Sequence, residues 1–176
     1  MTPPSVEMAP VLVIVGPPGA GKTTVGVRLA AQLGVAFRDN DTDIEAATGK
    51  TVREIFITDG EQAFRSIEAA TAARTLGSFE GVISLGGGAV LDPDTRALLS
   101  GRRVLYLRVG LAEAVRRVGM AQSRPVLTLN PRSALRELLA QRTPLYEQVA
   151  TVTIDTDGRT PDEVAALAAH ELEAVK

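Results

Sequence analysis

Residues 16–23 read GPPGAGKT, a glycine-rich segment that ends in a lysine and a threonine. This spacing matches the pattern G-x-x-x-x-G-K-[ST], in which glycines let successive backbone amides turn toward a polyphosphate. A helix that starts directly after the segment adds partial positive charge. Lys22 then reaches the terminal phosphates, and Thr23 offers its hydroxyl to Mg²⁺. The segment therefore predicts that the chain binds a nucleoside triphosphate together with Mg²⁺. The expected contacts come from Gly19, Ala20, Gly21, Lys22, Thr23 and Thr24.

Three aspartates, Asp39, Asp41 and Asp43, stand on alternate positions after a short apolar run. In an open parallel sheet, ligands lie at the carboxyl ends of the strands, so these acids and the glycine-rich segment are expected on the same rim. Asp39 and Asp41, two apart in an extended segment, would project to one side, toward the phosphates. Asp43 is interpreted as a helix cap. Asp155, at the end of a later apolar run, is the alternative acid for a metal ion.

Short aliphatic runs alternate with stretches of helical spacing along the chain. The runs predict buried strands, and their alternation with helices predicts right-handed crossovers and a parallel sheet covered on both faces. Strands are expected at residues 11–15, 35–38, 82–85, 104–109 and 152–155. Helices are expected at residues 22–33, 52–56 and 61–76, from Pro93, at 112–118 and 133–141, and after Thr160. The predicted fold class is α/β, with three α/β/α layers around a five-stranded parallel sheet.

The composition excludes several other kinds of protein. The 176 residues contain no cysteine, which excludes a disulfide framework, thiolate zinc sites and a cysteine nucleophile. The formal net charge of -2 argues against a nucleic-acid partner, because neutralising phosphates usually requires a basic excess. No apolar run approaches the roughly 20 residues of a membrane span, and the first ten residues lack the features of a secretory signal. We therefore expect a cytoplasmic protein with neither a membrane nor a nucleic-acid partner.

The length fits one domain, expected at residues 10–176, after a flexible leader at residues 1–9. Residues 119–131 have no clear period and are rich in small, polar and proline residues. Loops of this length in compact domains are often lids. A mobile lid is therefore expected at residues 119–131.

Six sequence blocks, in order along the chain, resemble those of the shikimate kinase family, which belongs to the nucleoside-monophosphate-kinase-like P-loop group. The blocks are GPPGAGKTT, DNDTDIE, EIFITDGEQAFRSIE, LGGGAV, SRPVL and RTPLYEQVA, within a match from about residue 11 to residue 161. The resemblance implies the P-loop kinase fold and ATP-dependent phosphorylation of the 3-hydroxyl of shikimate. Shikimate would be the small-molecule partner, ATP and Mg²⁺ the cofactors, and a monomer is expected.

The resemblance also assigns roles to individual residues. Asp39 would help to hold Mg²⁺ together with Thr23, while Asp41 would contact the accepting hydroxyl as a base or as an orienting group. Arg65 and Arg142 would grip the carboxylate of the substrate, since a planar guanidinium forms two parallel hydrogen bonds with a carboxylate. The same pocket would be lined by Gly86, Gly87 and Gly88, where backbone can approach a ligand closely.

The spacing alone is also compatible with purely structural roles for Arg65 and Arg142. Arg65 lies at helical spacing from Glu61 and Glu68, which would also fit an exposed ladder of ion pairs. If the resemblance holds, Glu61 is instead expected to orient Arg65. Arg142, two residues before Pro144, would also suit the end of a helix, where a positive charge is favourable.

Three further arginines match nucleotide-binding positions of the family. Arg124 matches the lid arginine that closes on the β- and γ-phosphates, and Arg117 and Arg159 match positions that flank the adenine. The expected catalytic residues are Lys22, Asp41 and Arg124. The chain departs from the family pattern at Asn40, where a small hydroxyl residue is usual, and at Val126, where leucine is usual. Neither departure removes a catalytic side chain.

Two other functions remain open at the level of sequence. A gluconokinase-like enzyme is also a short P-loop kinase that acts on a hydroxy acid, although the FRSIE, GGG and RTPLY blocks argue against it. A kinase-like module that senses shikimate without turnover would be expected to have lost its catalytic aspartate, whereas Asp41 is present.

Overall fold

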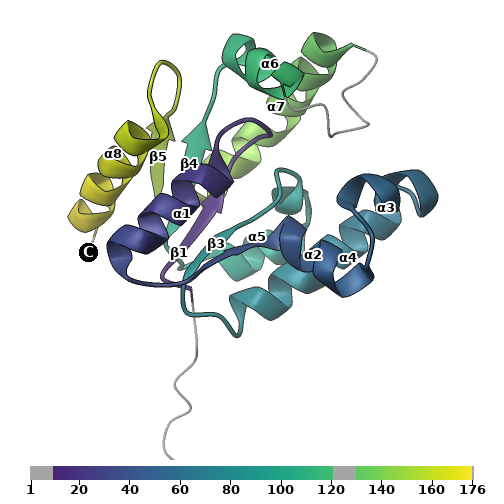
Figure 1. Ribbon diagram of the computed structural model, residues 1–176, viewed down its shortest axis with the longest axis horizontal. Coiled ribbons are helices and arrows are strands. Elements are labelled where there is room, and N and C mark those ends of the chain that lie inside the picture. The colour runs from purple at the N-terminus through teal and green to yellow at the C-terminus, as the bar shows by residue number, and fades with distance from the viewer. Residues whose placement is uncertain (1–9, 121–129, 176) are drawn as a thin grey trace, which may run out of the picture.

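The computed structural model describes residues 10–120 and 130–175. In these ranges a five-stranded, wholly parallel sheet is covered by helices on both faces, which confirms the predicted fold class (Figure 1). The strands are β1 (Leu12–Val15), β2 (Phe37–Asp39), β3 (Val82–Ser84), β4 (Val104–Arg108) and β5 (Val152–Asp155). The helices are α1 (Lys22–Leu33), α2 (Asn40–Thr48), α3 (Val52–Thr58), α4 (Glu61–Leu76), α5 (Pro93–Leu99), α6 (Leu111–Met120), α7 (Pro131–Val149) and α8 (Pro161–Ala174), with a 3₁₀ turn, η1, at Ala89–Leu91.

The strand order β2-β3-β1-β4-β5 places β1 in the centre of the sheet. The chain leaves β1 toward β2 on one side and later returns to β4 on the other side. The carboxyl end of β1 is therefore a point where the direction of strand succession reverses, and such points hold the ligand sites of open α/β sheets. The glycine-rich segment follows this central strand directly.

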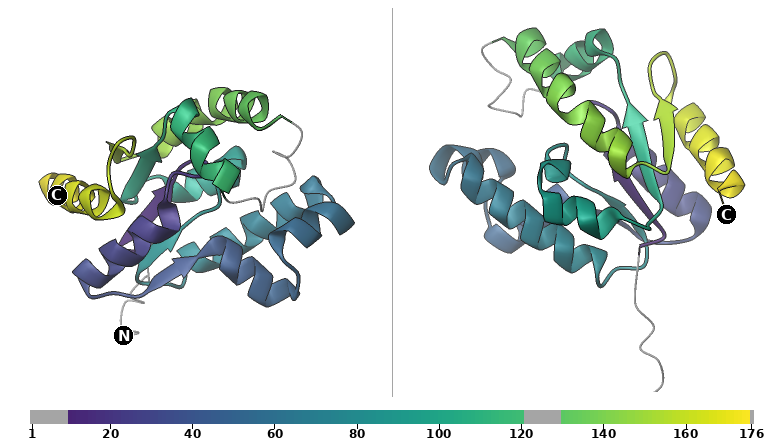
Figure 2. Two further views of the ribbon diagram at one scale, coloured as in Figure 1. Left: turned by 45° about the horizontal axis from the view of Figure 1, so that its top comes forward. Right: turned by 180° about the vertical axis from the view of Figure 1, so that it is seen from behind.

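Side chains of β1 alternate between two hydrophobic layers, as the pleat of a strand requires. Leu12 and Ile14 belong to the layer covered by α1 and α8, and Val13 and Val15 to the layer covered by α4 and α5 (Figure 2). Both faces of the strand are thus buried, which explains why its sequence is continuously aliphatic.

Helix α7 is longer than the sequence predicts, because it continues through Pro144 to Val149 instead of ending at residue 141. Proline is unfavourable inside a helix, since it lacks an amide hydrogen and crowds the preceding turn. Packing beyond the proline offsets this cost. The Tyr146 side chain is fully buried, and its ring stacks on that of Tyr106 with 5.1 Å between the centroids.

Helices α2, α3 and α4 form a separate small cluster beside the edge strand β2, held by Ile44, Ile55 and Phe64. Gly60 joins α3 to α4 with a φ of 89°, a backbone conformation that side-chain-bearing residues avoid. This cluster forms one wall of the site described below.

Several expectations fall on parts of the chain that the structure does not describe. They are the leader at residues 1–9, residues 121–129 of the expected lid, and Arg124 and Val126 within it. Across residues 10–120 and 130–175, no helix combines the length and the apolar character that crossing a membrane would require.

Candidate active site

The glycine-rich segment forms an open turn of backbone between β1 and α1. Gly19 and Gly21 have φ angles of 80° and 86°, which only glycine adopts readily. The first backbone hydrogen bond of α1 runs from the amide of Val25 to the carbonyl of Gly21 at 2.9 Å, and no side chain caps the helix. The amides of Lys22, Thr23 and Thr24 thus precede the hydrogen-bonded part of the helix, an arrangement that suits an anion.

Lys22 lies across this turn. Its Nζ donates to the carbonyls of Gly16 at 2.9 Å and of Pro17 at 3.1 Å, and the residue is 9% exposed. The backbone therefore fixes the position of the ammonium group, which places a buried positive charge beside the turn. A positive charge at this point favours a polyphosphate in the turn.

Asp39 caps helix α2 and also contacts the glycine-rich turn. Its Oδ1 accepts a hydrogen bond from the amide of Asp41 at 2.9 Å, and its Oδ2 accepts one from the Thr23 hydroxyl at 2.7 Å. The two residues expected to hold Mg²⁺ are thus in direct contact. The acids and the turn share one rim of the sheet, as the sequence predicts.

The interpretation of the third aspartate is wrong, because Asp39 and not Asp43 is the cap. The helix begins at Asn40, so Asp41 lies in its first turn and not in an extended segment. Asp43 instead forms an ion pair with Arg38 at 3.0 Å. A carboxylate at the residue before a helix satisfies free amides, and this explains why the helix starts so early.

The alternative metal-binding acid, Asp155, is engaged elsewhere. It forms a surface ion pair with Arg108, whose guanidinium lowers the pKa of Asp155. Its side chain remains 59% exposed.

A cavity of about 380 Å³ opens between the glycine-rich turn and the α2–α3–α4 cluster. Its walls include Pro18 from the turn, Asp41 from α2, and Gly87 from the segment after β3. The apolar side chains in the lining are those of Val52, Phe56, Phe64 and Leu138. A cavity of this size, mostly apolar with a few convergent polar groups, is typical of small-molecule sites.

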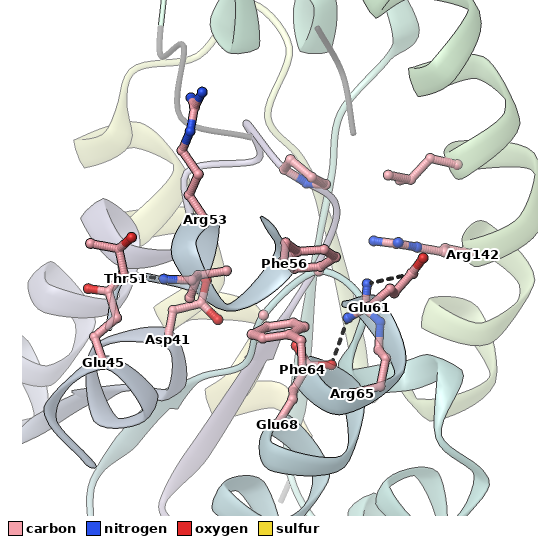
Figure 3. Close-up of a pocket in the computed structure, with 16 residues that line it drawn as sticks. Asp41, Glu45, Thr51, Arg53, Phe56, Glu61, Phe64, Arg65, Glu68 and Arg142 are labelled. Atoms are coloured by element: carbon pink, nitrogen blue, oxygen red, sulfur yellow. Dashed lines mark hydrogen bonds and ion pairs between the residues drawn. The ribbon is translucent and has the colours of Figure 1, made fainter. Parts of the chain in front are cut away.

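Two arginines enter this cavity from the side opposite to Asp41 (Figure 3). Arg142, from the middle of α7, is 9% exposed and makes no ion pair within the part of the chain that the structure describes. Burial lowers the pKa of Arg142. A buried guanidinium is costly without an anionic partner, so this cavity favours a ligand that carries a carboxylate or a phosphate.

Arg65 is held in place by two glutamates and two aromatic rings. Its Nη1 donates to Oε1 of Glu68 at 2.7 Å, and its Nη2 lies 3.5 Å from Oε1 of Glu61. The guanidinium also lies over the rings of Phe56 and Phe64, at 5.9 and 5.2 Å from their centroids. The interpretation of Arg65 as part of an exposed ladder of ion pairs is therefore wrong, because its shortest contact is with the buried Glu68.

The glycines after β3 allow these groups to converge. A Cβ atom on Gly86 would lie 2.8 Å from Oε2 of Glu68 and 2.9 Å from Oδ1 of Asp41, and one on Gly88 would clash with the guanidinium of Arg65. Any side chain at these two positions would displace a charged group of the cavity.

A second cavity, of about 490 Å³, lies on the other side of the glycine-rich turn. Its lining includes Gly19, Gly21, Thr24, Arg117, Arg159 and Pro161. Hydrogen bonds from Arg116 and then Arg117 lower the pKa of Glu113 to about 2, so this acid is ionised at neutral pH. All the nucleotide-binding positions expected from the sequence, apart from Arg124, are thus grouped around the turn and this cavity.

Comparison with known proteins assigns this arrangement to a family. A family described as Shikimate kinase matches residues 18–173. The chain belongs to the shikimate kinase family. A shikimate kinase from Salinispora arenicola is 56% identical over 167 residues, which cover 95% of this chain and 100% of the relative. One from Streptomyces coelicolor is 54% identical over 166 residues, covering 93% of this chain and 97% of the relative.

A solved structure extends this result to the fold. The shikimate kinase from Acinetobacter baumannii, solved in complex with shikimate, superimposes with a TM-score of 0.91 at 36% identity, covering 96% of this chain and 95% of that chain. Membership of the shikimate kinase family, the P-loop kinase fold and the kinase class predicted from the sequence are confirmed. The gluconokinase-like alternative is not favoured.

The cavity also contains groups that the sequence analysis did not assign. The sequence suggests only a surface partner in Glu68, whereas this residue is 2% exposed and holds Arg65. Its spacing of three residues from Arg65 could have indicated the contact, but not the burial. Arg53 lines the cavity as well, and nothing in its sequence context indicates this position.

We expect Glu68 to make stability depend on pH. Burial raises the pKa of Glu68 above its ordinary 4.5, although the Arg65 guanidinium acts in the opposite direction. Its stabilising contribution is therefore complete below pH 4.5 and is lost as the pH rises through the higher native pKa. Glutamine at this position cannot ionise. The free energy of unfolding of Glu68→Gln minus that of the parent should therefore be larger at about pH 8 than at about pH 5. Urea denaturation at both pH values measures this difference.

Glu61→Gln is the control for this experiment, because it removes an exposed acid from the same helix. A relative stability of Glu68→Gln that stays constant or falls with increasing pH would contradict the prediction.

Proposed function

We propose that the chain transfers the γ-phosphoryl group of ATP to the 3-hydroxyl of shikimate. One observation carries this proposal. Buried Arg142 and half-buried Arg65 face Asp41 across a cavity that borders the glycine-rich turn (Figure 3). A small cyclic acid held by its carboxylate at the arginines would extend a hydroxyl toward both Asp41 and the phosphates.

We propose that the nucleotide lies along the glycine-rich turn, with its base in the second cavity. The backbone amides in the first turn of α1 and the Lys22 ammonium suit the phosphates. Arg117 and Arg159 line the cavity that would receive the adenine. Family resemblance adds Arg124 as a contact to the β- and γ-phosphates.

Mg²⁺ would be held by Thr23 and, through water, by Asp39. Within residues 10–120 and 130–175 there is no group of three or more His, Asp or Glu side chains that could hold a metal ion. Mg²⁺, however, is commonly bound by one or two protein groups together with water and substrate phosphates. The direct contact between the Thr23 hydroxyl and the Asp39 carboxylate fits that mode. Bound there, the ion would neutralise charge on the phosphates.

Phosphoryl transfer depends mainly on positioning and on electrostatic stabilisation. Asp41 would accept the hydrogen bond of the 3-hydroxyl and take its proton, as the oxygen forms a bond to the γ-phosphorus and the bond to ADP breaks. Lys22 would stabilise negative charge on the phosphoryl oxygens. Arg65 and Arg142 would fix the ring so that only one hydroxyl reaches the phosphate. Residues 10–176 would form one catalytic domain, acting as a monomer, with a lid at residues 119–131.

Asp39→Asn tests the metal assignment. Asparagine caps helices about as well as aspartate, so α2 should keep its start while the charge beside Thr23 is lost. We expect the Mg²⁺ concentration for half-maximal activity to rise by about 10- to 100-fold. A magnesium titration of initial rates measures this change. Asp155→Asn is the control, and an equal shift in both variants would contradict the assignment.

The proposed function is tested by a coupled assay of ADP release with shikimate, quinate and gluconate as acceptors. We expect release that depends on shikimate and is much slower with the other two acids. No release with shikimate would refute the proposal. If shikimate binds but no ADP is released, the chain is a sensing module and not an enzyme.

A further inference from the structure

The guanidinium of Arg117 connects three parts of the nucleotide side of the molecule. From helix α6, its Nη1 donates to the carbonyl of Gly19 at 3.0 Å and to Oγ1 of Thr156 at 3.2 Å. Its Nη2 donates to the carbonyl of Thr156 at 3.2 Å, and its Nε to Oε1 of Glu113 at 2.8 Å. The position of this charged group therefore depends on the glycine-rich turn, on α6 and on the segment that follows β5.

Thr156 is the buried partner in this set of contacts. It follows β5 directly and is 2% exposed. Its amide donates to the carbonyl of Arg108 at 2.9 Å, and its hydroxyl donates to the same carbonyl at 3.1 Å. A hydroxyl has one donor and two acceptor positions, so Thr156 can donate to β4 and accept from Arg117 at the same time.

We propose that the Thr156 hydroxyl is a positioning residue for nucleotide binding, acting through Arg117. It joins the rigid strand β4 to the Arg117 guanidinium, and both Thr156 and Arg117 line the second cavity. The inference rests on the proposed function, in which this cavity receives the base of ATP. It adds a residue outside the glycine-rich turn that sets the orientation of the arginine facing the base.

The Thr156 hydroxyl mainly controls how the Arg117 guanidinium is oriented. It has less influence on whether the guanidinium stays in the cavity. Without Oγ1, Nη1 keeps the carbonyl of Gly19, Nη2 keeps the carbonyl of Thr156, and the ion pair with Glu113 still holds the charge in the cavity. The guanidinium plane is then fixed by three hydrogen bonds in place of four, which allows it to tilt. Since a guanidinium stacks on a planar ring through its face, tilting weakens contact with a base but leaves the phosphate contacts of the turn intact.

Thr156→Val tests the proposal, because valine has nearly the shape of threonine and keeps every backbone contact. We expect the dissociation constant of ATP, measured by calorimetry, to rise by about three- to tenfold, the effect of one lost hydrogen bond. The KM for ATP should rise in parallel, with kcat and the KM for shikimate unchanged. Binding of inorganic tripolyphosphate, which has no base, should also be unchanged.

Two variants separate positioning from a general loss of structure. Thr156→Ser keeps the hydroxyl and should restore parental ATP affinity. Thr151 stands before β5, and its hydroxyl contacts the backbone at the other end of β4, donating to Arg102 at 3.1 Å and accepting from Val104 at 3.1 Å. Thr151→Val removes a comparable hydroxyl far from the nucleotide and should leave ATP binding unchanged.

The outcomes distinguish this inference from the proposed function. If the parent protein does not bind ATP, the proposed function fails. If the parent binds ATP and Thr156→Val binds it equally well, or weakens ATP and tripolyphosphate alike, the inference is overturned. Should Thr156→Val not fold, Thr156→Ala removes the same hydroxyl and is judged by the same criteria.

Discussion

Asp41→Asn is expected to lower kcat by about 10²- to 10⁴-fold, the usual contribution of a positioned general base. The KM for ATP and the KM for shikimate should change little. Asparagine has the size of aspartate and can still contact a hydroxyl, but it cannot accept the proton. Steady-state kinetics with both substrates varied measures all three constants.

The position of Asp41 explains why the effect should fall on kcat. The residue is half-buried in the first turn of α2 and lines the cavity opposite the two arginines. Oδ1 of Asp41 and Oε2 of Glu68 both lie within 3 Å of the point that a Cβ atom on Gly86 would occupy. A second carboxyl group this close disfavours ionisation of both acids at once, and the charge of Asp41 contributes to the raised pKa of Glu68.

Asp43→Asn is the matched control, because Asp43 lies two residues further along the same helix and pairs with Arg38 outside the cavity. Its kcat should match that of the parent. A parental kcat in Asp41→Asn would show that Asp41 only orients the hydroxyl and would remove the base from the mechanism.

Arg142→Met is expected to raise the KM for shikimate by about 10²-fold or more, the usual result of removing one partner of a buried charge pair. The dissociation constant of ATP should stay close to that of the parent, because α7 does not line the second cavity among the described residues. Methionine fills similar space with an uncharged chain, so the cavity keeps its shape. Shikimate titrations of initial rate and ATP calorimetry separate the two effects.

The same substitution should not reduce stability. Burial lowers the pKa of Arg142, which shows that the folded protein disfavours this charge without a ligand. Replacing it with an apolar side chain is therefore expected to leave the free energy of unfolding equal or higher, as is common for residues kept for function.

Arg136→Met, an exposed position on the same helix, controls for the loss of a positive charge. Equal losses of shikimate and ATP binding in Arg142→Met would contradict the assignment of the carboxylate site.

Much of this architecture can be predicted from sequence because local signals are strong where backbone geometry is restricted. The glycine-rich segment, the five aliphatic runs and the spacing of helices each have one favoured structure. The parallel sheet then brings residues after β1 and β2 to a common rim, which explains why Thr23 and Asp39 meet.

The errors have a common physical cause, which is tertiary packing that a local pattern does not report. Three alternating aspartates offer three possible caps, and only the end of β2 decides that Asp39 takes this role. Likewise, Pro144 suggests the end of a helix, but burial of Tyr146 extends α7 beyond it. Local propensity is overridden where enough apolar surface is gained.

Burial of polar groups is equally hard to read from sequence. Glu68 and Thr156 have unremarkable neighbours, and each becomes informative only when its contacts to an arginine are known. The family resemblance identifies residues that touch ligands, but it does not identify those that hold the ligand-binding side chains in place.

A crystal structure of the chain with ADP, Mg²⁺ and shikimate would test the central claim most directly. We expect the shikimate carboxylate on Arg65 and Arg142, and its 3-hydroxyl about 2.6–3.2 Å from Asp41, on the side of the cavity nearest the glycine-rich turn. Shikimate bound with its carboxylate toward Asp41, or bound outside this cavity, would contradict it.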